Sequence, residues 1–214
     1  MNRALAMYGE TLSPGGGDRA GRVVARKLDG STRRVPIERW LAAADEVDEH
    51  CLGLLQGPVL DVGCGPGRHL HALARLGVFG LGVDISAAAV TVARGSGATA
   101  VVASIFDELP GTGHWRSALL FDGNVGIGGH PTRLLRRVAR LLIPGGALLV
   151  EVAAPSIPTV RTLLRLETRG SRSEWFPWAE VSAADIERVA ASAGLAVESC
   201  WQVQRRWFAL LRRV

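Results

Sequence analysis

The fold of this chain is decided by nine residues, Val59-Leu60-Asp61-Val62-Gly63-Cys64-Gly65-Pro66-Gly67. Residues 59–62 are apolar apart from Asp61, which predicts a buried strand. The three glycines that follow have no Cβ atoms, so the backbone can turn with a positive φ and approach a ligand closely. Residues 68–76 then carry apolar side chains at helical spacing. The turn therefore opens a helix, whose free N–H groups favour a polar or anionic ligand.

The spacing of the glycines separates two kinds of cofactor site. The dinucleotide fingerprint G-x-G-x-x-G has its third glycine one residue later than here, and its strand is usually apolar to the end. In this chain the pattern is Asp61-x-Gly63-x-Gly65-x-Gly67, with an acidic residue inside the strand end. This pattern resembles the first motif of class I S-adenosylmethionine-dependent methyltransferases. A nucleotide-linked dehydrogenase is disfavoured by the same spacing.

A second acidic strand end lies seventeen positions after Gly67. Residues 79–86 predict a strand that ends at Asp84, and Ser86 is expected to cap the next helix. The resemblance implies that the Asp84 carboxylate accepts hydrogen bonds from the cofactor ribose. It also implies that Ile85 lies against the adenine.

The adenine end of the site departs from the family pattern. Family members often read Asp-x-Phe-Asp-x-Leu-Pro after the third strand, and the first Asp accepts from the adenine amino group. Ser104 stands at that position here. Adenine recognition is therefore left to the Ser104 hydroxyl, to the backbone near Ile105, or to Asp107 if the loop is shifted by one turn.

The later elements complete the resemblance, which runs from about residue 59 to residue 152. A strand at 117–121 leads to Asp122 and Asn124, and a helix, Pro144-Gly145-Gly146 and a strand at 147–152 follow. Ligands of an open parallel sheet bind outside the carboxyl ends of its strands, so the polar strand ends should converge on one rim. The expected cofactor residues are Asp61, Gly63, Cys64, Gly65, Asp84, Ile85, Ser104, Ile105 and Asp122.

The resemblance implies an α/β fold, a three-layer αβα sandwich with a mostly parallel seven-stranded sheet. Its expected strand order is 3-2-1-4-5-7-6, with the last strand antiparallel, and residues 195–203 and 207–211 predict the final hairpin. We expect one domain over residues 1–214. Its expected parts are an N-terminal lid and helix (1–57), the cofactor-binding core (58–152), an insertion that covers the substrate (153–180) and a C-terminal helix and β-hairpin (181–214).

Several segments outside the core carry expectations of their own. Residues 9–35 show no sustained period and contain Pro14-Gly15-Gly16-Gly17, which predicts a loop or lid edge. The 3.6-residue spacing from Pro36 predicts one helix that ends near residue 57. A strand is predicted over residues 160–168, and a helix with a near-capping box at Ser182-x-x-Asp185.

The acceptor site is less well defined by the sequence. We expect Asn124, Trp175 and Trp178 to contact the substrate, with packing in a satellite core as the alternative for the two tryptophans. His130 follows the loop after the fourth strand, and imidazole titrates near neutral pH, so it is the candidate general base. The alternative for His130 is a surface residue that precedes Pro131.

Composition limits the classes of function. The 214 residues carry a net charge of +5, but Lys27 is the one lysine among 25 basic residues, which with abundant Ala, Gly and Val indicates a GC-rich, bacterial genome. The arginines near residues 133–140 fit a solvated helix face, so we do not expect nucleic acid as a partner. Three cysteines without paired spacing suggest neither disulfides nor a zinc site and fit a cytoplasmic protein. No apolar run predicts a membrane span or a signal peptide.

The sequence therefore favours a methyltransferase that uses S-adenosylmethionine, with S-adenosylhomocysteine as its product, and a small-molecule acceptor. No metal is expected. A catalytically inactive S-adenosylmethionine-binding regulatory protein and a methyltransferase that acts on RNA are the alternatives. The acceptor atom and the oligomeric state stay open.

Overall fold

Strand β3 (Val59–Val62) lies in the interior of a seven-stranded sheet, as expected for a short, wholly buried strand. The computed structural model describes residues 3–12 and 23–214. Beside β3 run β4 (Gly80–Asp84) and β5 (Ala100–Val102) on one side, and β6 (Trp115–Leu120) and β7 (Leu142–Val152) on the other, all parallel.

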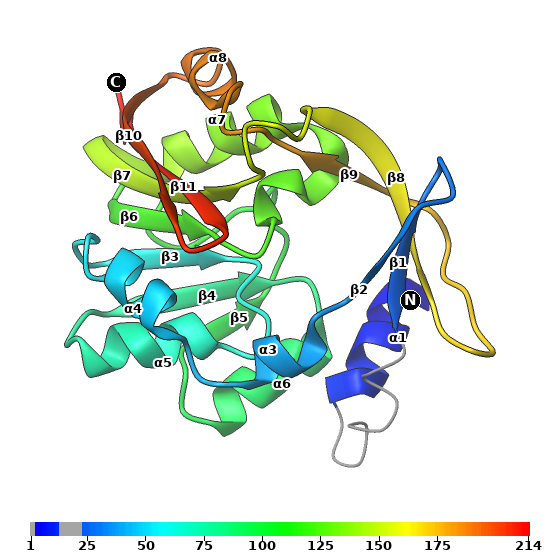
Figure 1. The fold of residues 1–214 in the computed structure, drawn as a ribbon. Coiled ribbons are helices and arrows are strands. Elements are labelled where there is room, and N and C mark those ends of the chain that lie inside the picture. The colour runs from blue at the N-terminus through cyan, green and yellow to red at the C-terminus, as the bar shows by residue number, and fades with distance from the viewer. Residues whose placement is uncertain (1–2, 13–22) are drawn as a thin grey trace.

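The C-terminal hairpin closes the far side of this sheet. Strand β11 (Arg206–Arg213) pairs antiparallel with β7, and β10 (Leu195–Val203) pairs antiparallel with β11 at the edge. The order is β5-β4-β3-β6-β7-β11-β10, which confirms the predicted order 3-2-1-4-5-7-6 and the antiparallel last strand (Figure 1).

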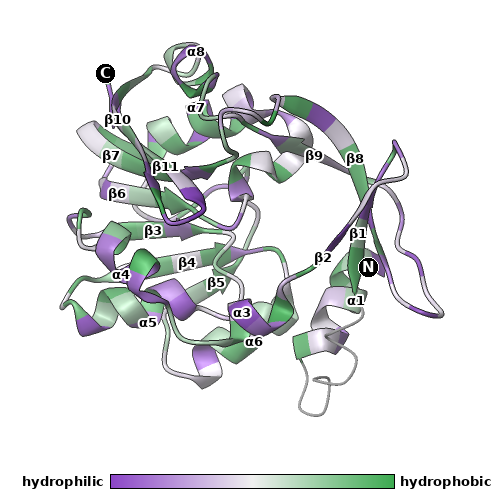
Figure 2. Cartoon of the chain, in the orientation of Figure 1, coloured by the Kyte–Doolittle hydropathy of each residue, from purple (hydrophilic) through white to green (hydrophobic). Residues whose placement is uncertain are grey.

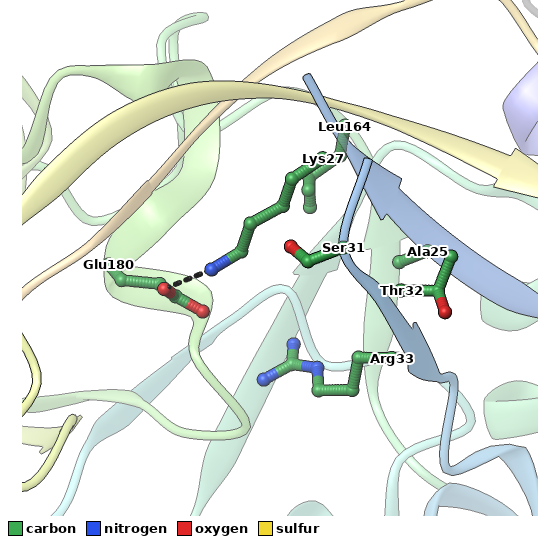
Figure 3. Close-up of a pocket in the computed structure, with 7 residues that line it drawn as sticks. All are labelled: Ala25, Lys27, Ser31, Thr32, Arg33, Leu164 and Glu180. Atoms are coloured by element: carbon green, nitrogen blue, oxygen red, sulfur yellow. Dashed lines mark hydrogen bonds and ion pairs between the residues drawn. The ribbon is translucent and has the colours of Figure 1, made fainter. Parts of the chain in front are cut away.

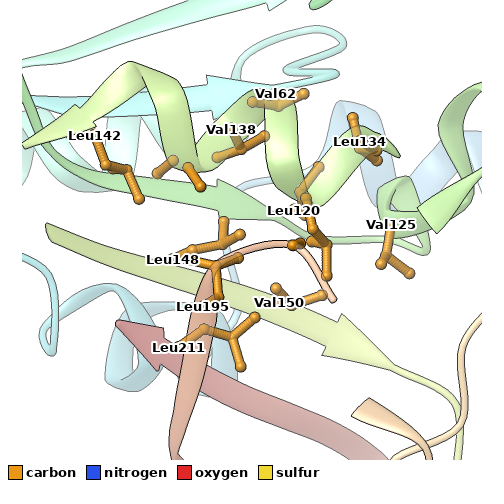
Figure 4. Close-up of a cluster of buried hydrophobic side chains, with 14 of the residues drawn as sticks. Val62, Leu120, Val125, Leu134, Val138, Leu142, Leu148, Val150, Leu195 and Leu211 are labelled. Atoms are coloured by element: carbon orange, nitrogen blue, oxygen red, sulfur yellow. The ribbon is translucent and has the colours of Figure 1, made fainter. Parts of the chain in front are cut away.

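Helices cover both faces of the sheet. Alternate residues of each strand belong to different apolar clusters, so Leu148 and Val150 pack on one face and Leu149 on the other. The first face is covered by α7 (Pro131–Leu141) and α8 (Ile186–Ala191), and Figure 4 shows Leu134 and Val138 of α7 against the strand residues. The second face is covered by α4 (Glu46–Leu52), α5 (Arg68–Arg75) and α6 (Ala87–Gly95). The hydrophobic colour of the central strands in Figure 2 agrees with this three-layer arrangement.

A second, four-stranded sheet stands beside the carboxyl ends of the parallel strands. It consists of β1 (Val24–Lys27), β2 (Thr32–Arg34), β8 (Val160–Glu167) and β9 (Phe176–Glu180), in the antiparallel order β2-β1-β8-β9 (Figure 1). The predicted strand at 160–168 is confirmed. We call this unit the small sheet.

The prediction of a loop over residues 9–35 was wrong where the structure describes that segment. Residues 9–12 belong to α1 (Arg3–Leu12), and β1 and β2 follow. These strands are short and rich in charge, and β1 pairs with a strand far away along the chain, so local periodicity did not predict them. The Pro14–Gly17 segment lies outside the described residues.

Two helix predictions also need correction. The expected helix from Pro36 is broken into α3 (Ile37–Leu41) and α4, because Asp45 and Asp48 form a reciprocal capping box that starts a new helix. Ser182 does not cap α8, which begins at Ile186 after Asp185. Ser182 instead forms a bridge with Ala153, which ties the end of β9 to the end of β7. In the described ranges, 3–12 and 23–214, none of the helices has the length and apolar character needed to span a bilayer.

Candidate active site

The glycine turn after β3 has the conformation that its sequence predicts. Gly63 and Gly65 have φ values of 74° and 53°, a region that residues with a Cβ avoid. The Gly65 N–H donates to Oδ2 of Asp84 at 2.9 Å, and the Ser86 N–H donates to Oδ1 at 2.8 Å. Asp84 therefore joins the turn to the end of β4, and each of its oxygens keeps a lone pair for a further donor. Burial raises the pKa of Asp84, which makes added donors favourable for the ionised form.

Tyr8 of α1 covers this turn. Its hydroxyl would lie 3.1 Å from a Cβ built on Gly65, and burial followed by the charge of Asp84 raises the pKa of Tyr8. The ring makes an edge contact with Trp40 at 5.8 Å between centroids. Gly9 on the same helix packs against Ala88 at the start of α6, because a Cβ there would lie 2.9 Å from the Ala88 Cβ. Helix α1 is thus packed on the glycine turn through Tyr8 and on α6 through Gly9.

Of the residues predicted to contact adenine, the structure leaves some accessible and buries another. Ile85 is 55% exposed, which is unusual for isoleucine and leaves an apolar surface beside Asp84. The Ser104 Oγ accepts from the Phe106 N–H at 3.1 Å, and within residues 3–12 and 23–214 it donates no hydrogen bond. Ile105 is buried in the core, and its carbonyl accepts from Arg137, so its side chain does not face the rim.

Asp122 follows the end of β6 at the same rim, but its carboxylate is already engaged. Both oxygens accept from Nη2 of Arg68, at 2.9 and 2.8 Å. Asp122 has a φ of 56°, a strained value for a residue with a Cβ, and its N–H donates to Glu151 at 2.8 Å. The strained conformation is therefore held by partners on α5 and β7.

Arg68 belongs to a buried charge network below the turn. Its guanidinium also contacts Asp48 of α4, which is fully buried. Arg206 of β11 donates to Asp48 at 2.7 Å and holds Glu151 with two bonds of 2.8 Å. Burial alone would raise the pKa of Asp48, but His69, Arg68 and Arg206 hold it well below its usual range. The network connects the C-terminal hairpin to α5, the helix that begins directly after the glycine turn.

Asp61 lies in the interior rather than on the open rim. It is 1% exposed, and its Oδ2 has no hydrogen-bond partner in the described part of the chain. The Nδ1 of His69 lies 3.8 Å from that oxygen, and the other ring nitrogen lies 3.8 Å from Asp48. Burial raises the pKa of Asp61 to about 6.

Asn124 and Cys64 support the turn from below. The Asn124 amide donates to the carbonyls of Val62 and Gly63, at 2.9 Å each, which occupies both of its N–H groups. The Cys64 side chain is buried against Gly82, where a Cβ would lie 2.6 Å from the sulfur. Burial raises the pKa of the Cys64 thiol, so it stays protonated. Both side chains shape the site without facing its open side.

His130 is exposed, and its imidazole is in contact with an arginine. The Arg161 Nη2 lies 2.5 Å from Nε2 of His130, and the same guanidinium donates to the Gly129 carbonyl at 2.8 Å. Since arginine has no acceptor, the Nε2 of His130 is on the accepting side of this contact. The geometry therefore gives no support to the hypothesis of His130 as a general base.

The two candidate substrate tryptophans lie on opposite faces of the small sheet. Ala25 and Leu166 pack with Tyr8 and α6, so their face is the one turned toward the rim, and we call it the inner face. The strand register places Trp178 on the inner face. Its ring packs on Gly126 in η1 (Asn124–Gly129), directly after the end of β6. Trp175 instead stacks under Arg165 of the outer face, 4.6 Å from the ring centroid.

Sequence reasoning missed Tyr8 and the charge network. Tyr8 follows no motif, and its place over Gly65 depends on how α1 packs on α6. Arg68 did carry a signal, because a charged residue inside the first turn of a helix that must be buried needs partners. Its partners, Asp48 of α4 and Asp122 after β6, come from two other parts of the chain, which the sequence does not place together.

The polar strand ends, the glycine turn and the sheet order define the class I fold of S-adenosylmethionine-dependent methyltransferases. The chain belongs to the methyltransferase-domain family, whose sequence profile matches residues 37–200. A ubiquinone biosynthesis O-methyltransferase of Acinetobacter baylyi is 48% identical over 48 residues, which span 22% of this chain and 20% of that protein. The chain thus matches about a fifth of that relative.

Solved structures share the fold at low sequence identity. A methyltransferase of Bacteroides fragilis in complex with S-adenosyl-L-homocysteine is 19% identical with a TM-score of 0.81, over 100% of this chain and 95% of that chain. A 1,6-didemethyltoxoflavin-N1-methyltransferase of Burkholderia thailandensis is 19% identical with a TM-score of 0.62, over 83% and 82%. The sugar N-methyltransferase KedS8 of Streptoalloteichus is 20% identical with a TM-score of 0.56, over 78% and 83%. The predicted family and its cofactor, S-adenosylmethionine, agree with these findings.

Proposed function

We propose that this protein transfers a methyl group from S-adenosylmethionine to a small-molecule acceptor. The observation that carries the proposal is the Asp84 carboxylate, held by two backbone N–H groups between the glycine turn and the exposed Ile85. Such a pair suits a ribose diol and an adenine ring side by side. When bound, the cofactor supplies an electrophilic methyl group on a sulfonium.

The chain's own residues bind and orient the cofactor, and they exclude water from the site of transfer. In the proposal, Asp84 holds the ribose, Ile85 supports the adenine, and the Ser104 hydroxyl donates to a ring nitrogen. Gly65 lets the backbone approach the methionyl part, and Tyr8 closes the space above it. Transfer then needs mainly an acceptor aligned with the methyl group in a site from which water is excluded.

The acceptor lies, in this proposal, between the rim and the inner face of the small sheet. Support comes from Trp178, which packs on the backbone directly after β6, and from Tyr8, which contacts both the glycine turn and the small-sheet cluster. The small sheet is built from residues 24–34 and 160–180. These are segments outside the cofactor-binding core, as expected for a part that sets acceptor choice. The domain division by function given above stays a proposal.

An RNA acceptor is less well supported. Three of the four arginines of α7 are engaged within the protein: Arg133 lies over the Phe106 ring at 4.8 Å, Arg136 donates to the Ser192 carbonyl and Arg137 to the Ile105 carbonyl. Arginines whose guanidinium groups contact carbonyls and a ring of the protein itself are poorly placed to bind the phosphates of RNA. The free thiols of Cys51, Cys64 and Cys200 fit a reducing cytoplasm.

Binding and turnover separate the proposal from its alternatives. S-adenosylmethionine should raise the melting temperature, whereas NAD should not. Binding measured by calorimetry, followed by a screen of small-molecule acceptors with labelled cofactor, distinguishes an enzyme from a regulatory binder. Stabilisation by NAD in place of S-adenosylmethionine would reject the proposal.

A further inference from the structure

The inner face of the small sheet contains a cavity with an uneven set of charges. Its lining includes Lys27, Ser31, Arg33, Leu164 and Glu180, and Figure 3 shows their side chains around one space. The register explains why they meet: Lys27 is opposite Leu164, Arg33 is opposite the inner-face residue Ala25, and Glu180 is opposite Val160. All therefore share the face that also carries Trp178.

Two of the three charged groups neutralise each other. The Lys27 ammonium lies 2.6 Å from Oε2 of Glu180, and both side chains are mostly buried, with 29% and 22% exposed. This pair reaches across β8 from β1 to β9. Arg33 extends into the same space, and among the described residues it has no ion pair or hydrogen bond, unlike its neighbour Arg34, which pairs with Glu38 on the helix that follows. The open side of the cavity thus carries one positive charge, that of the exposed Arg33, without a counter-charge among the described residues.

From this arrangement we infer that the cavity binds an anionic group of the methyl acceptor, a carboxylate or a phosphate, through Arg33. This inference rests on the proposed methyl transfer, because it describes the acceptor of that reaction, but its test measures anion binding alone. A guanidinium presents parallel N–H donors that match either oxyanion, and Leu164 adds an apolar wall for the carbon skeleton. The acceptor is therefore a small molecule that carries a fixed negative charge at some distance from the atom that is methylated.

The test uses simple anions with a neutral match. Benzoate and phenyl phosphate are compared with benzamide by saturation-transfer NMR at low ionic strength, in the presence of S-adenosylhomocysteine. The wild-type protein should bind an anionic probe at least several-fold more tightly than benzamide. Preference for benzoate points to a carboxylate and preference for phenyl phosphate to a phosphate, so either result supports the site and narrows the acceptor.

Matched variants make the assignment specific. Arg33→Gln should remove the preference for the anion, whereas Arg34→Gln, one residue along the strand and on its other face, should keep it. Glu180→Gln leaves Lys27 without its counter-charge, so the anionic probe should bind more tightly, a gain that loss of folding could not produce. Calorimetry with S-adenosylhomocysteine on the same proteins checks the proposed function separately. Equal binding of benzoate and benzamide, or an anion preference that survives Arg33→Gln, would overturn the inference even if the cofactor binds.

Discussion

Asp84 performs two tasks at once, and its substitution should show both. Its carboxylate fixes the glycine turn through the Gly65 N–H and, in the proposed function, accepts from the ribose. We expect Asp84→Ala to weaken S-adenosylmethionine binding by about 1.5–3 kcal/mol, the usual range for a charged acceptor, measured by calorimetry. Asp84→Asn, which keeps one oxygen acceptor, should lose less. Glu198→Ala on β10, whose side chain pairs with Arg212, is the control and should bind normally. An unchanged affinity in Asp84→Ala would contradict the role.

Asp61 makes stability depend on pH in the opposite direction from most carboxylates. Burial raises the pKa of Asp61 to about 6 from its ordinary value of 3.8, so the folded protein binds this proton more tightly than the unfolded chain does. The contribution of Asp61 is therefore greatest below about pH 4, falls as the pH rises to about 6, and is constant above. A difference of that size corresponds to about 3 kcal/mol.

The measurement compares urea unfolding of the wild type and Asp61→Asn between pH 4 and 6.5. In the variant, the free energy of unfolding should no longer show the decrease between about pH 4 and 6 that comes from Asp61. Asp48, whose pKa is lowered, acts in the other sense, because its contribution is lost as the pH falls below about 4. Parallel curves for the two proteins over this range would show that Asp61 does not titrate there.

At the scale of elements, Gly126 allows the small sheet to pack closely against the core. A Cβ on Gly126 of η1 would lie 2.1 Å from the Ala179 carbonyl oxygen and 2.6 Å from the Trp178 ring nitrogen. Gly126→Ala should therefore separate η1 from β9 and destabilise the protein by about 1–3 kcal/mol, the range for overpacking. The matched control is Gly170→Ala in the connection between β8 and β9, where nothing lies within 4 Å. Equal unfolding midpoints in urea for both variants would show that the contact is not required.

Elements of the large sheet were predictable because their signals are local. The apolar run at 59–62, the glycines after it and the Ser86 cap each specify their own backbone conformation, and the family resemblance supplied the strand order. Strands β1 and β2 are different, because their sequences VARK and TRR carry mostly charge and gain stability from pairing with β8. The break between α3 and α4 did have a local signal in Asp45-x-x-Asp48, which the continuous apolar spacing outweighed.

The site shows the same division between local and distant information. Gly65 and Asp84 could be found from the motif, because their geometry follows from the turn itself. The contacts of Asp122 with Arg68 and of His130 with Arg161 join side chains from different elements, so they could not be found from local sequence. The opposite orientations of Trp175 and Trp178 could not be assigned until the strand β9 was known to start at Phe176.

At the scale of the whole molecule, α1 joins the two sheets across the rim. Its first N–H groups, of Arg3 and Ala4, donate to the Glu174 carboxylate at 2.9 and 3.2 Å, next to β9. Its other end packs on α6 through Gly9, and Tyr8 lies between these anchors over Gly65. A cofactor in the proposed site would therefore be covered by α1, and exchange of cofactor would require α1 to move.

Hydrogen exchange tests this covering role. S-adenosylhomocysteine should slow amide exchange in α1 and in the glycine turn together, although the two are distant in sequence. Glu174→Ala removes the acceptor of the first N–H groups without touching the glycine turn, so α1 amides should exchange faster and cofactor should dissociate faster, by roughly tenfold for one or two lost hydrogen bonds. Glu187→Ala, on α8, is the matched control. Because the ring of Tyr8 would still cover the turn, Tyr8→Phe should change dissociation less than Tyr8→Ala. If cofactor binding protects the glycine turn and leaves α1 exchange unchanged, α1 is a fixed part of the wall and not a cover that opens.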